Sequence, residues 1–283
     1  MIKIETLEVS GFKGAILGMR NPFKNRDRSD SGFKSMLSGN YEDETGMAID
    51  PNFVNDNMRY RFAPVLIGPK DLDLCQKLVR AGGDDDAKFL RMIHVQADVT
   101  APLYWWKEFD TYKVATVANS ESTMHTIAKK QFTLDDFAYE KLQTIEDDDE
   151  EELTEPSEFL HMLNQRLRDK DIDVPDDDLE LMYPIDILTS TIHMLNACRE
   201  AYIIANETGR TADAYIYWYN MIQLLPSSYM QKRTVDLNYQ TLRRIFFARR
   251  HHKLTEWAGE ENSFCVWIET LPYAKELITY EGK

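Results

Sequence analysis

Charged and aromatic side chains alternate closely between Tyr104 and Lys113, and this stretch holds the residues best suited to chemistry. Lys107 and Glu108 stand directly before Phe109 in the middle of it. Polar groups that are buried beside aromatic rings must be paired or must face a ligand. The pattern therefore favours a pocket for a small polar molecule, with an ordinary aromatic core as the alternative.

Several familiar chemistries have no motif in this chain. There is no P-loop, no GxGxxG and no GxSxG. His251 and His252 are adjacent and would point about 100° apart on a helix, and the i, i+4 pair His252 and Glu256 lacks the rest of an HExxH motif. We therefore expect no metal site. A general acid or base cannot be selected from 48 Asp and Glu residues by sequence alone.

The composition limits the class of partner. The 283 residues are 43% hydrophobic and carry a formal net charge of −15, which disfavours binding to nucleic acid polymers. Cys75, Cys198 and Cys265 are far apart and are expected to be free buried thiols of a reducing compartment. Neither a signal peptide nor a run of about 18 apolar residues is present, so we expect a cytoplasmic protein without a membrane span.

The elements that would position the Tyr104–Lys113 stretch follow from hydrophobic periodicity. Residues 93–99 alternate strictly and predict a strand, as does segment 2–9, with Ile2 and Ile4 on one face and Leu7 and Val9 on the other. Pro69 begins a helix that ends at Gly82-Gly83, and Pro102 suits the first turn of another. On that second helix one stripe of residues recurs at i, i+4, i+7 and i+11, namely Trp105, Phe109, Tyr112 and Thr116.

The remaining segments complete an expected single α+β domain, residues 1–283, with a small and mostly antiparallel sheet, flanking helices and a helical C-terminal half. Residues 20–62 form a long, locally basic loop, either solvated or an arm that faces a phosphate. A short capped helix is expected at 135–144, and 144–157 is an acidic mobile insertion. Residues 185–257 predict three helices, of which the last is capped by Thr234.

The segment from Val99 to Ser122, VTAPLYWWKEFDTYKVATVANSES, resembles the signature region of the flavin-dependent thymidylate synthases. Laid without gaps from Ala101-Pro102, that family's Arg-His-Arg falls on Thr111, Tyr112 and Lys113. Its first motif serine falls on Thr116, and the glutamine before the triplet falls on Glu108.

A second segment matches far along the chain. Leu225-Pro226, Asn238 and Arg249 are spaced like the family's Leu-Pro, its flavin-contacting asparagine and its nucleotide-contacting arginine. Two collinear matches, covering roughly 65–130 and 185–257, imply a thymidylate-synthase-complementing-protein-like fold in which 185–257 completes the site.

The phosphate-binding end departs from the family pattern. The last motif serine and arginine fall on Glu121 and Thr123, and a shift by one residue recovers Asn119 and Ser122 but still no arginine. Another nucleotide-contacting arginine falls on Ile222.

The resemblance implies a divergent enzyme that binds FAD and a pyrimidine mononucleotide, dUMP or a relative, and transfers a one-carbon unit to C5. NADPH and methylenetetrahydrofolate would be co-substrates, and the assembly would be a homotetramer. Two alternatives stay open, a non-catalytic nucleotide- or flavin-binding protein and a structural interaction protein. The implied cofactor contacts are Tyr112, Lys113, Thr116 and Asn238. The implied substrate contacts are Glu108, Thr111, Asn119, Ser122 and Arg249.

Overall fold

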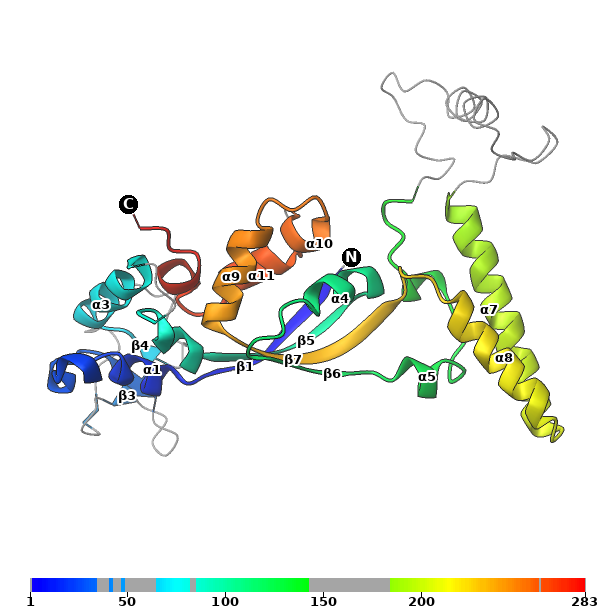
Figure 1. Cartoon of the computed structure of the whole chain (residues 1–283), viewed down its shortest axis with the longest axis horizontal. Coiled ribbons are helices and arrows are strands. Elements are labelled where there is room, and N and C mark those ends of the chain that lie inside the picture. Colours follow the sequence, from blue (N-terminus) through cyan, green and yellow to red (C-terminus); the bar gives the residue numbers. More distant parts are fainter. Residues whose placement is uncertain are drawn as a thin grey trace, which may run out of the picture. The chain divides into compact units, whose positions relative to one another are not determined.

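The computed structural model describes residues 2–34, 41–42, 47–48, 65–81, 85–142, 184–259 and 261–282 (Figure 1). Packing contacts divide the chain into two compact units, and the single domain expected for residues 1–283 stays a prediction. The first unit is Met1–Glu121 with Met230–Lys283, and the second is Ser122–Tyr229. The expected acidic insertion at 144–157 lies outside the described residues, as does most of 20–62 beyond Lys34.

A four-stranded antiparallel sheet forms the centre of the first unit. Its order is β1-β5-β7-β6, so β1 and β6 are the edge strands. The strands are β1 (Lys3–Ser10), β5 (His94–Pro102), β7 (Met230–Asn238) and β6 (Thr116–Ser120). The sheet confirms the predicted α+β fold class with a small antiparallel sheet, and it confirms the two strands expected from alternation.

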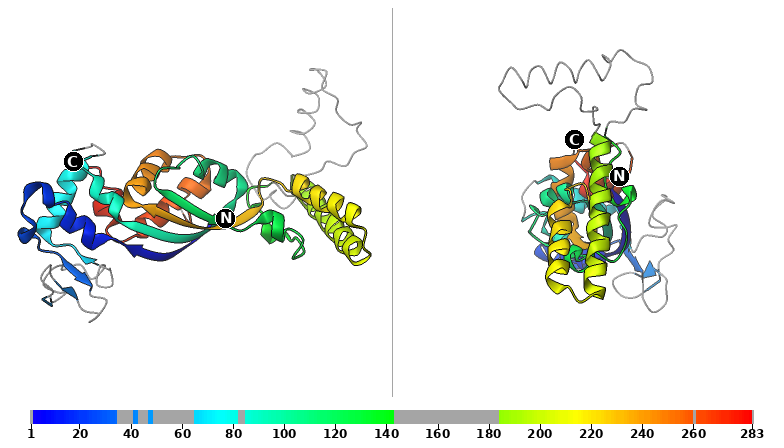
Figure 2. Two further views of the ribbon diagram at one scale, coloured as in Figure 1. Left: turned by 60° about the horizontal axis from the view of Figure 1, so that its bottom comes forward. Right: turned by 90° about the vertical axis from the view of Figure 1, so that its right-hand side faces the viewer.

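One face of this sheet is apolar and packs against helices. Val95, Ala97 and Val99 on β5 are fully buried, and β7 aligns Leu237 and Val235 beside them. The helices α4 (Leu103–Phe109), α9 (Tyr239–Arg249) and α11 (Phe264–Thr270) lie over this face, as Figures 1 and 2 show. The apolar residues at every second position of the sequence are therefore the ones whose side chains contact the core.

The helix predicted from Thr234 is wrong. Residues 230–238 form β7 instead, and α9 begins only at Tyr239 with Asn238 as its N-cap. Residues 230–238 present every second side chain to the core face, and β5 pairs with them along their whole length. Tertiary pairing of this kind overrides a helical pattern that looks plausible in isolation. The region 185–257 thus holds two helices, a strand, the helix α9 and the start of a short helix at Thr255.

The helix after Pro102 is shorter than its aromatic stripe predicted. It ends at Phe109, where the amides of Thr111 and Tyr112 bond to carbonyls three residues back in a tightened last turn. Ala115 then adopts a left-handed conformation (φ 55°), and the chain returns as edge strand β6. Tyr112 and Thr116 therefore do not continue the helical stripe.

The N-terminal part of the first unit surrounds one end of the sheet. It contains α1 (Phe12–Gly18), the 3-10 turns η1 (Asn21–Phe23), η2 (Arg26–Arg28) and η4 (Lys88–Met92), the predicted α3 (Pro69–Arg80), and a small sheet of β2 (Gly32–Lys34), β3 (Tyr41–Glu42) and β4 (Val65–Leu66). Gly11 enters α1 at φ 87°, and a Cβ there would lie 1.8 Å from the carbonyl oxygen of Met92. Only glycine fits this approach of α1 to η4.

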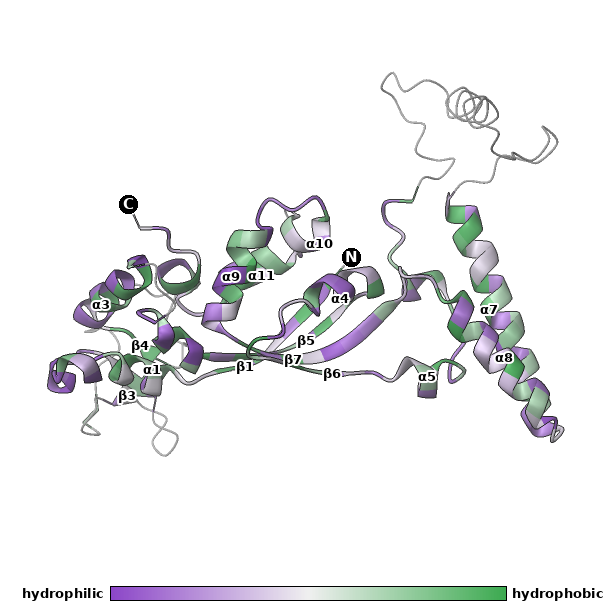
Figure 3. Cartoon of the chain, in the orientation of Figure 1, coloured by the Kyte–Doolittle hydropathy of each residue, from purple (hydrophilic) through white to green (hydrophobic). Residues whose placement is uncertain are grey.

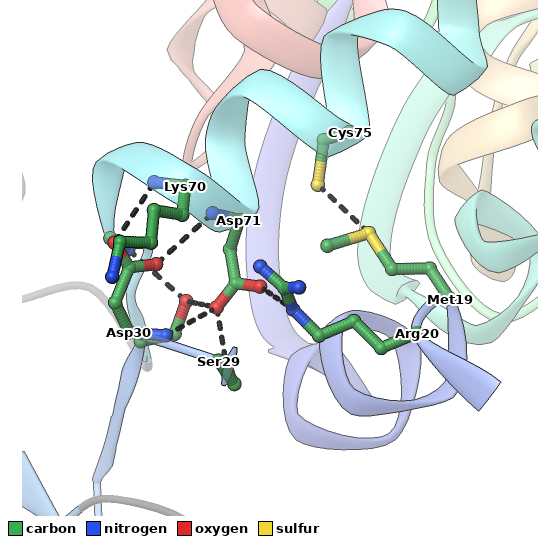
Figure 4. Close-up of polar contacts among 9 residues, drawn as sticks. Met19, Arg20, Ser29, Asp30, Lys70, Asp71 and Cys75 are labelled. Atoms are coloured by element: carbon green, nitrogen blue, oxygen red, sulfur yellow. Dashed lines mark hydrogen bonds and ion pairs between the residues drawn. The ribbon is translucent and has the colours of Figure 1, made fainter. Parts of the chain in front are cut away.

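Arg20 and residues 29–31 are bonded to the start of α3, as Figure 4 shows for Arg20, Ser29 and Asp30. The Asp71 carboxylate at the start of α3 is fully buried and pairs with the Arg20 guanidinium. It also accepts hydrogen bonds from the hydroxyls of Ser29 (2.7 Å) and Ser31 (2.6 Å). Asp30 reciprocates by accepting from the Lys70 and Asp71 amides at 2.9 and 3.0 Å. The solvated-loop interpretation is therefore wrong for Arg20 and residues 29–33, whereas residues 21–24 and 26–28 are exposed.

The second unit consists mainly of two long helices. These are α7 (Pro184–Glu207) and α8 (Thr211–Leu224), both as predicted, which pack against each other after a short turn. Their common core includes Leu195 and Met221 and takes up Phe132 and Phe137 from the preceding segment. That segment holds α5 (Thr123–Thr126) and η5 (Leu134–Asp136). The helix predicted at 135–144 is only this 3-10 turn, because Asp136 bonds back to the Thr133 amide and closes it.

Two further expectations concern cysteines and membranes. Cys75, Cys198 and Cys265 are buried free thiols, as predicted, and burial raises the pKa of Cys265 to about 12. In the described parts of the chain, no helix is both long and apolar enough to cross a membrane.

Candidate functional site

The C-terminal end of α9 brings three of the predicted site residues together. Leu242 and Ile245 anchor α9 in the core, so its last turn projects Arg249 toward the end of α4. There Arg249 meets Glu108 of α4 and Tyr112 from the turn that follows it. Residues 141 positions apart in the chain thus form one polar cluster.

The guanidinium of Arg249 has partners on several sides. Its Nε donates to the Tyr112 hydroxyl at 2.7 Å, and its Nη1 donates to Glu108 Oε1. Its central carbon lies 5.5 Å from the Tyr112 ring centroid and 5.3 Å from that of Trp257, which belongs to α10 (Thr255–Ala258). Cation–π contacts and charge-assisted hydrogen bonds together hold the group in one orientation.

Glu108 is the centre of the cluster. Its Oε2 accepts a hydrogen bond from the Trp257 indole at 2.8 Å, and its Oε1 lies 3.3 Å from Nε2 of His252. The Leu254 amide donates to Nδ1 of His252 at 3.1 Å, so in the neutral ring the proton sits on Nε2 and points to Glu108. The carboxylate is therefore surrounded by donors.

The cluster has a dry floor and a side open to solvent. Trp257 and Trp105 below it are fully buried. The side chains of Arg249, Glu108 and His252 are 19%, 27% and 24% exposed. A planar polar molecule could reach the charged groups from this side while contacting the partly exposed ring of Tyr112. The cluster joins polar and aromatic groups as the sequence predicted, and the pocket itself stays a prediction.

Other predicted residues lie elsewhere in the first unit. Thr111 and Lys113 are exposed in the turn after α4, and the Thr111 hydroxyl donates to the Glu108 carbonyl at 2.7 Å. Asn119 is exposed on edge strand β6, and Thr116 begins that strand with a buried hydroxyl that has no partner in the described part of the chain.

Asn238 and Ser122 are placed differently from their expected roles. Asn238 is buried, and its side chain accepts from the Thr241 amide at 2.9 Å as the N-cap of α9. Eleven residues of helix separate it from Arg249, a rise of about 16 Å. Ser122 belongs to the second unit, where its carbonyl accepts from the His125 and Thr126 amides.

The sequence did not point to Trp257 as part of this cluster. It bonds to Glu108 across 149 residues of chain, and no local pattern marks such a pairing. His252 did attract notice as a metal candidate with Glu256. In the described residues Glu256 instead accepts from the Tyr104 hydroxyl, and no group of three or more His, Cys, Asp or Glu side chains is positioned to hold a metal ion.

A second feature is a cavity of about 800 Å³ at the other end of the first unit. Basic side chains from α1, η2 and η4 line it, together with two carboxylates and aromatic rings. The residues that matter are Lys13, Arg26, Lys88, Arg91, Asp85, Asp86, Phe23 and Phe89. Arg91 also donates to Gln240, so the cavity wall is tied to the first turn of α9. The sequence noted Arg26 only as part of a basic, phosphate-facing arm.

Comparisons with known proteins bear on the fold. No protein-family model and no curated protein sequence matches the chain. A crystal structure of thymidylate synthase X (ThyX) from Helicobacter pylori with FAD and dUMP aligns over 98% of this chain and 97% of its own, with a TM-score of 0.52 and 12% identity. Another H. pylori structure of this flavin-dependent enzyme, also with FAD and dUMP, aligns over 99% and 100% with the same score and identity.

A UMP/dUMP methylase, PolB from Streptomyces cacaoi bound with 5-Br UMP, aligns over 100% of this chain and 95% of its own at 12% identity. Its TM-score of 0.47 is too low to support an inference. The H. pylori alignments show that this chain has the fold of the flavin-dependent thymidylate synthases, as its two sequence segments predicted.

Proposed function

We propose that this protein binds FAD and a pyrimidine mononucleotide and transfers a one-carbon unit to C5 of the base. The observation that carries the proposal is the cluster of Glu108, Tyr112 and Arg249. Two separate segments with family-like spacing supplied these residues, and they lie together in a chain with the matching fold.

The cluster suits the nucleotide. Arg249 offers directed donors to a base or phosphate, and the partly exposed Tyr112 offers an aromatic ring that a base can contact. Because Trp257 and Trp105 are fully buried, the floor of the site excludes water and strengthens polar contacts made above it. These residues would bind and orient the substrate.

The cavity suits the phosphate-bearing part of the flavin. Its volume lies within the range typical of cofactor sites, and Lys13, Lys88 and Arg91 can face a diphosphate while Phe23 faces a ring. The implied contacts Tyr112, Lys113, Thr116 and Asn238 stay proposals for the other end of the cofactor. When bound, the flavin supplies the redox and one-carbon chemistry, with NADPH and methylenetetrahydrofolate as co-substrates.

Non-catalytic binding is the second candidate function. It is favoured by the pairing of Arg249 with Glu108, which neutralises the one arginine matched to the family's nucleotide-contacting position. Thr111, Tyr112 and Lys113 in place of Arg-His-Arg point the same way. For a structural role, the full burial of Trp105 and Phe109 is the supporting fact.

We propose further that the chain forms a homo-oligomer, a tetramer by resemblance. Helix α7 is apolar along much of its length (Figure 3), and spacings of three, four and seven place small and apolar residues on one stripe: Ile187, Met194, Ala197, Ala201 and Ile204. Ile187, Met194 and Ile204 in this stripe are 55%, 54% and 57% exposed. In an antiparallel pair of α7 helices Met194 would face the small Ala197, which suits a two-fold contact.

Purified protein tests the proposal directly. We expect flavin absorbance in the protein as isolated or after FAD is added, and a thermal shift with pyrimidine mononucleotides. Release of tritium from a C5-labelled nucleotide, dependent on NADPH and methylenetetrahydrofolate, would support the enzyme over the binder. Protein that takes up neither FAD nor any pyrimidine nucleotide would leave only the structural role.

A further inference from the structure

We propose that the Glu108–Arg249 pair selects cytosine rather than uracil, so that the substrate class of the site is a cytidine mononucleotide. The inference rests on the proposed function, since it assigns the base that this site reads. It derives from the order of acceptors and donors that the pair presents.

The two bases differ at the edge that such a pair would read. Cytosine offers its N4 amino group as a donor beside the acceptors N3 and O2. Uracil offers O4 as an acceptor beside the N3–H donor. A carboxylate only accepts and a guanidinium only donates, so a Glu beside an Arg complements cytosine at both positions. The same pair would place an acceptor against O4 of uracil and a donor against its N3–H.

Both side chains keep unused capacity. Arg249 uses Nε for Tyr112 and Nη1 for Glu108, and among the described residues its Nη2 has no hydrogen-bond partner. Oε2 of Glu108 accepts one hydrogen bond, from Trp257, and a carboxylate oxygen can accept two. The two side chains are 19% and 27% exposed, so a ligand can reach part of each.

The surroundings fix Glu108 as an acceptor. The side chains of Arg249, Trp257 and His252 all direct donors at its two oxygens. A glutamine, which the resemblance places at this position, could turn its amide to accept or to donate. The carboxylate has no such freedom, so Glu108 is the residue that would set the preference.

Binding constants for dCMP and dUMP test the inference on the wild-type protein, by calorimetry with and without FAD. We expect dCMP to bind at least about tenfold more tightly, because a mismatched polar group in a partly buried site costs about that factor or more. N4,N4-dimethyl-dCMP lacks the amino donors and should lose the advantage. Equal or tighter binding of dUMP overturns the inference and leaves the proposed function standing.

The variant Glu108→Gln should shift the ratio of dCMP to dUMP affinity toward dUMP by about tenfold. Asp110→Asn is the matched control, because Asp110 lies two residues away and pairs with Arg233 at 2.8 Å outside the cluster. An unchanged ratio in a folded Glu108→Gln protein contradicts the inference. If neither nucleotide binds the wild-type protein, both the inference and the nucleotide-binding function fail. The wild-type comparison decides alone if the variant does not fold.

Discussion

Arg249 illustrates at the scale of single residues how a site residue can be held by the protein itself. It was expected to contact a nucleotide, and it is already oriented by a carboxylate, a phenol and two aromatic faces. A ligand that enters must therefore match the charge pattern of the pair, rather than meet an isolated cation.

Replacing Arg249 by Ala should weaken nucleotide binding and lower the free energy of unfolding by about 1–3 kcal/mol, because Glu108 loses its charged partner in a partly buried place. Arg249→Lys keeps the charge but loses the planar fork of donors. Its nucleotide affinity and stability should therefore lie between those of the wild type and Arg249→Ala. Urea denaturation and calorimetric titration measure the two effects. Normal binding by Arg249→Ala would remove this residue from the site.

Asp98 on β5 gives a pH-dependent contribution to stability. The Lys232 ammonium, and then the Thr234 hydroxyl, bond to its carboxylate at 2.5 and 2.6 Å and lower its pKa below the ordinary 3.8. A lowered folded-state pKa stabilises the fold above the unfolded-state value, and this stability is lost as the pH falls through the folded-state value.

Asp98→Asn and Lys232→Met should therefore make the denaturant midpoint less dependent on pH below about 4. Denaturation series from neutral pH downward, compared with the wild type, provide the measurement. If the denaturant midpoint of both variants falls with pH as steeply as that of the wild type, the Asp98–Lys232 pair does not cause the pH dependence of stability.

At the scale of elements, α3 shows how hydrogen bonds and a buried ion pair can hold a long connecting segment in place. Asp71 collects four donors from residues 20–31, while Asp30 returns two acceptors to the first amides of α3. Arg26, which lines the basic cavity, belongs to this segment. The buried attachment to α3 holds the segment in place, since it has no apolar core of its own.

Asp71→Ala should lower the free energy of unfolding by about 3 kcal/mol or more, because Arg20 is left buried without its counter-ion. Asp73→Ala is the control on the same helix. Its pair with Lys77 is exposed and is worth under about 0.5 kcal/mol. Similar losses in the two variants, measured by urea denaturation, would show that burial of the Arg20–Asp71 pair is not decisive.

The junction of β7 and α9 depends on one cap. Asn238→Ala should cost about 1 kcal/mol, since the Thr241 amide loses its acceptor at the start of α9. Asn238→Ser retains an acceptor and should lose less. Thermal melting distinguishes them, and equal melting of both variants and the wild type would rule out the cap as a stabilising element.

The two compact units have different surfaces at the scale of the whole molecule. In the first unit the exposed face of the sheet is polar, with paired groups such as Lys232 with Asp98 and His94 with Asp236. In the second unit α7 leaves Ile187, Met194 and Ile204 exposed on one stripe. Helix α8 exposes Tyr215, Ile216, Tyr219 and Leu224 as well, so apolar residues of both long helices are open to a partner.

If α7 pairs with a second copy, Met194→Glu should shift the protein to a smaller species in light scattering, because a charge would enter the apolar stripe. Thr189→Glu adds the same charge to an exposed position of α7 away from the stripe and should leave the mass unchanged. A wild-type protein that is monomeric at micromolar concentration would contradict the proposed oligomer.

The sequence predicted much of the fold and part of the site. Alternation and breakers located β1 and β5, while α3, α7 and α8 were predicted from helical spacing and caps. The resemblance selected Glu108, Tyr112 and Arg249, which the structure brings together. It did not select Trp257 or the basic cavity, because neither has a local pattern and each joins segments far apart in the chain.

By itself, then, the sequence determined the local elements and the types of chemical groups, since periodicity, proline, glycine and capping residues act over a few positions. Only the tertiary structure decided that 230–238 is a strand, because pairing with β5 outweighs the local helical pattern. The tertiary structure also decided which partners the charged residues between Tyr104 and Lys113 have. Glu108 faces Arg249 across 141 residues, and such a pairing arises only where the packing of α4, α9 and α10 brings the two charges together.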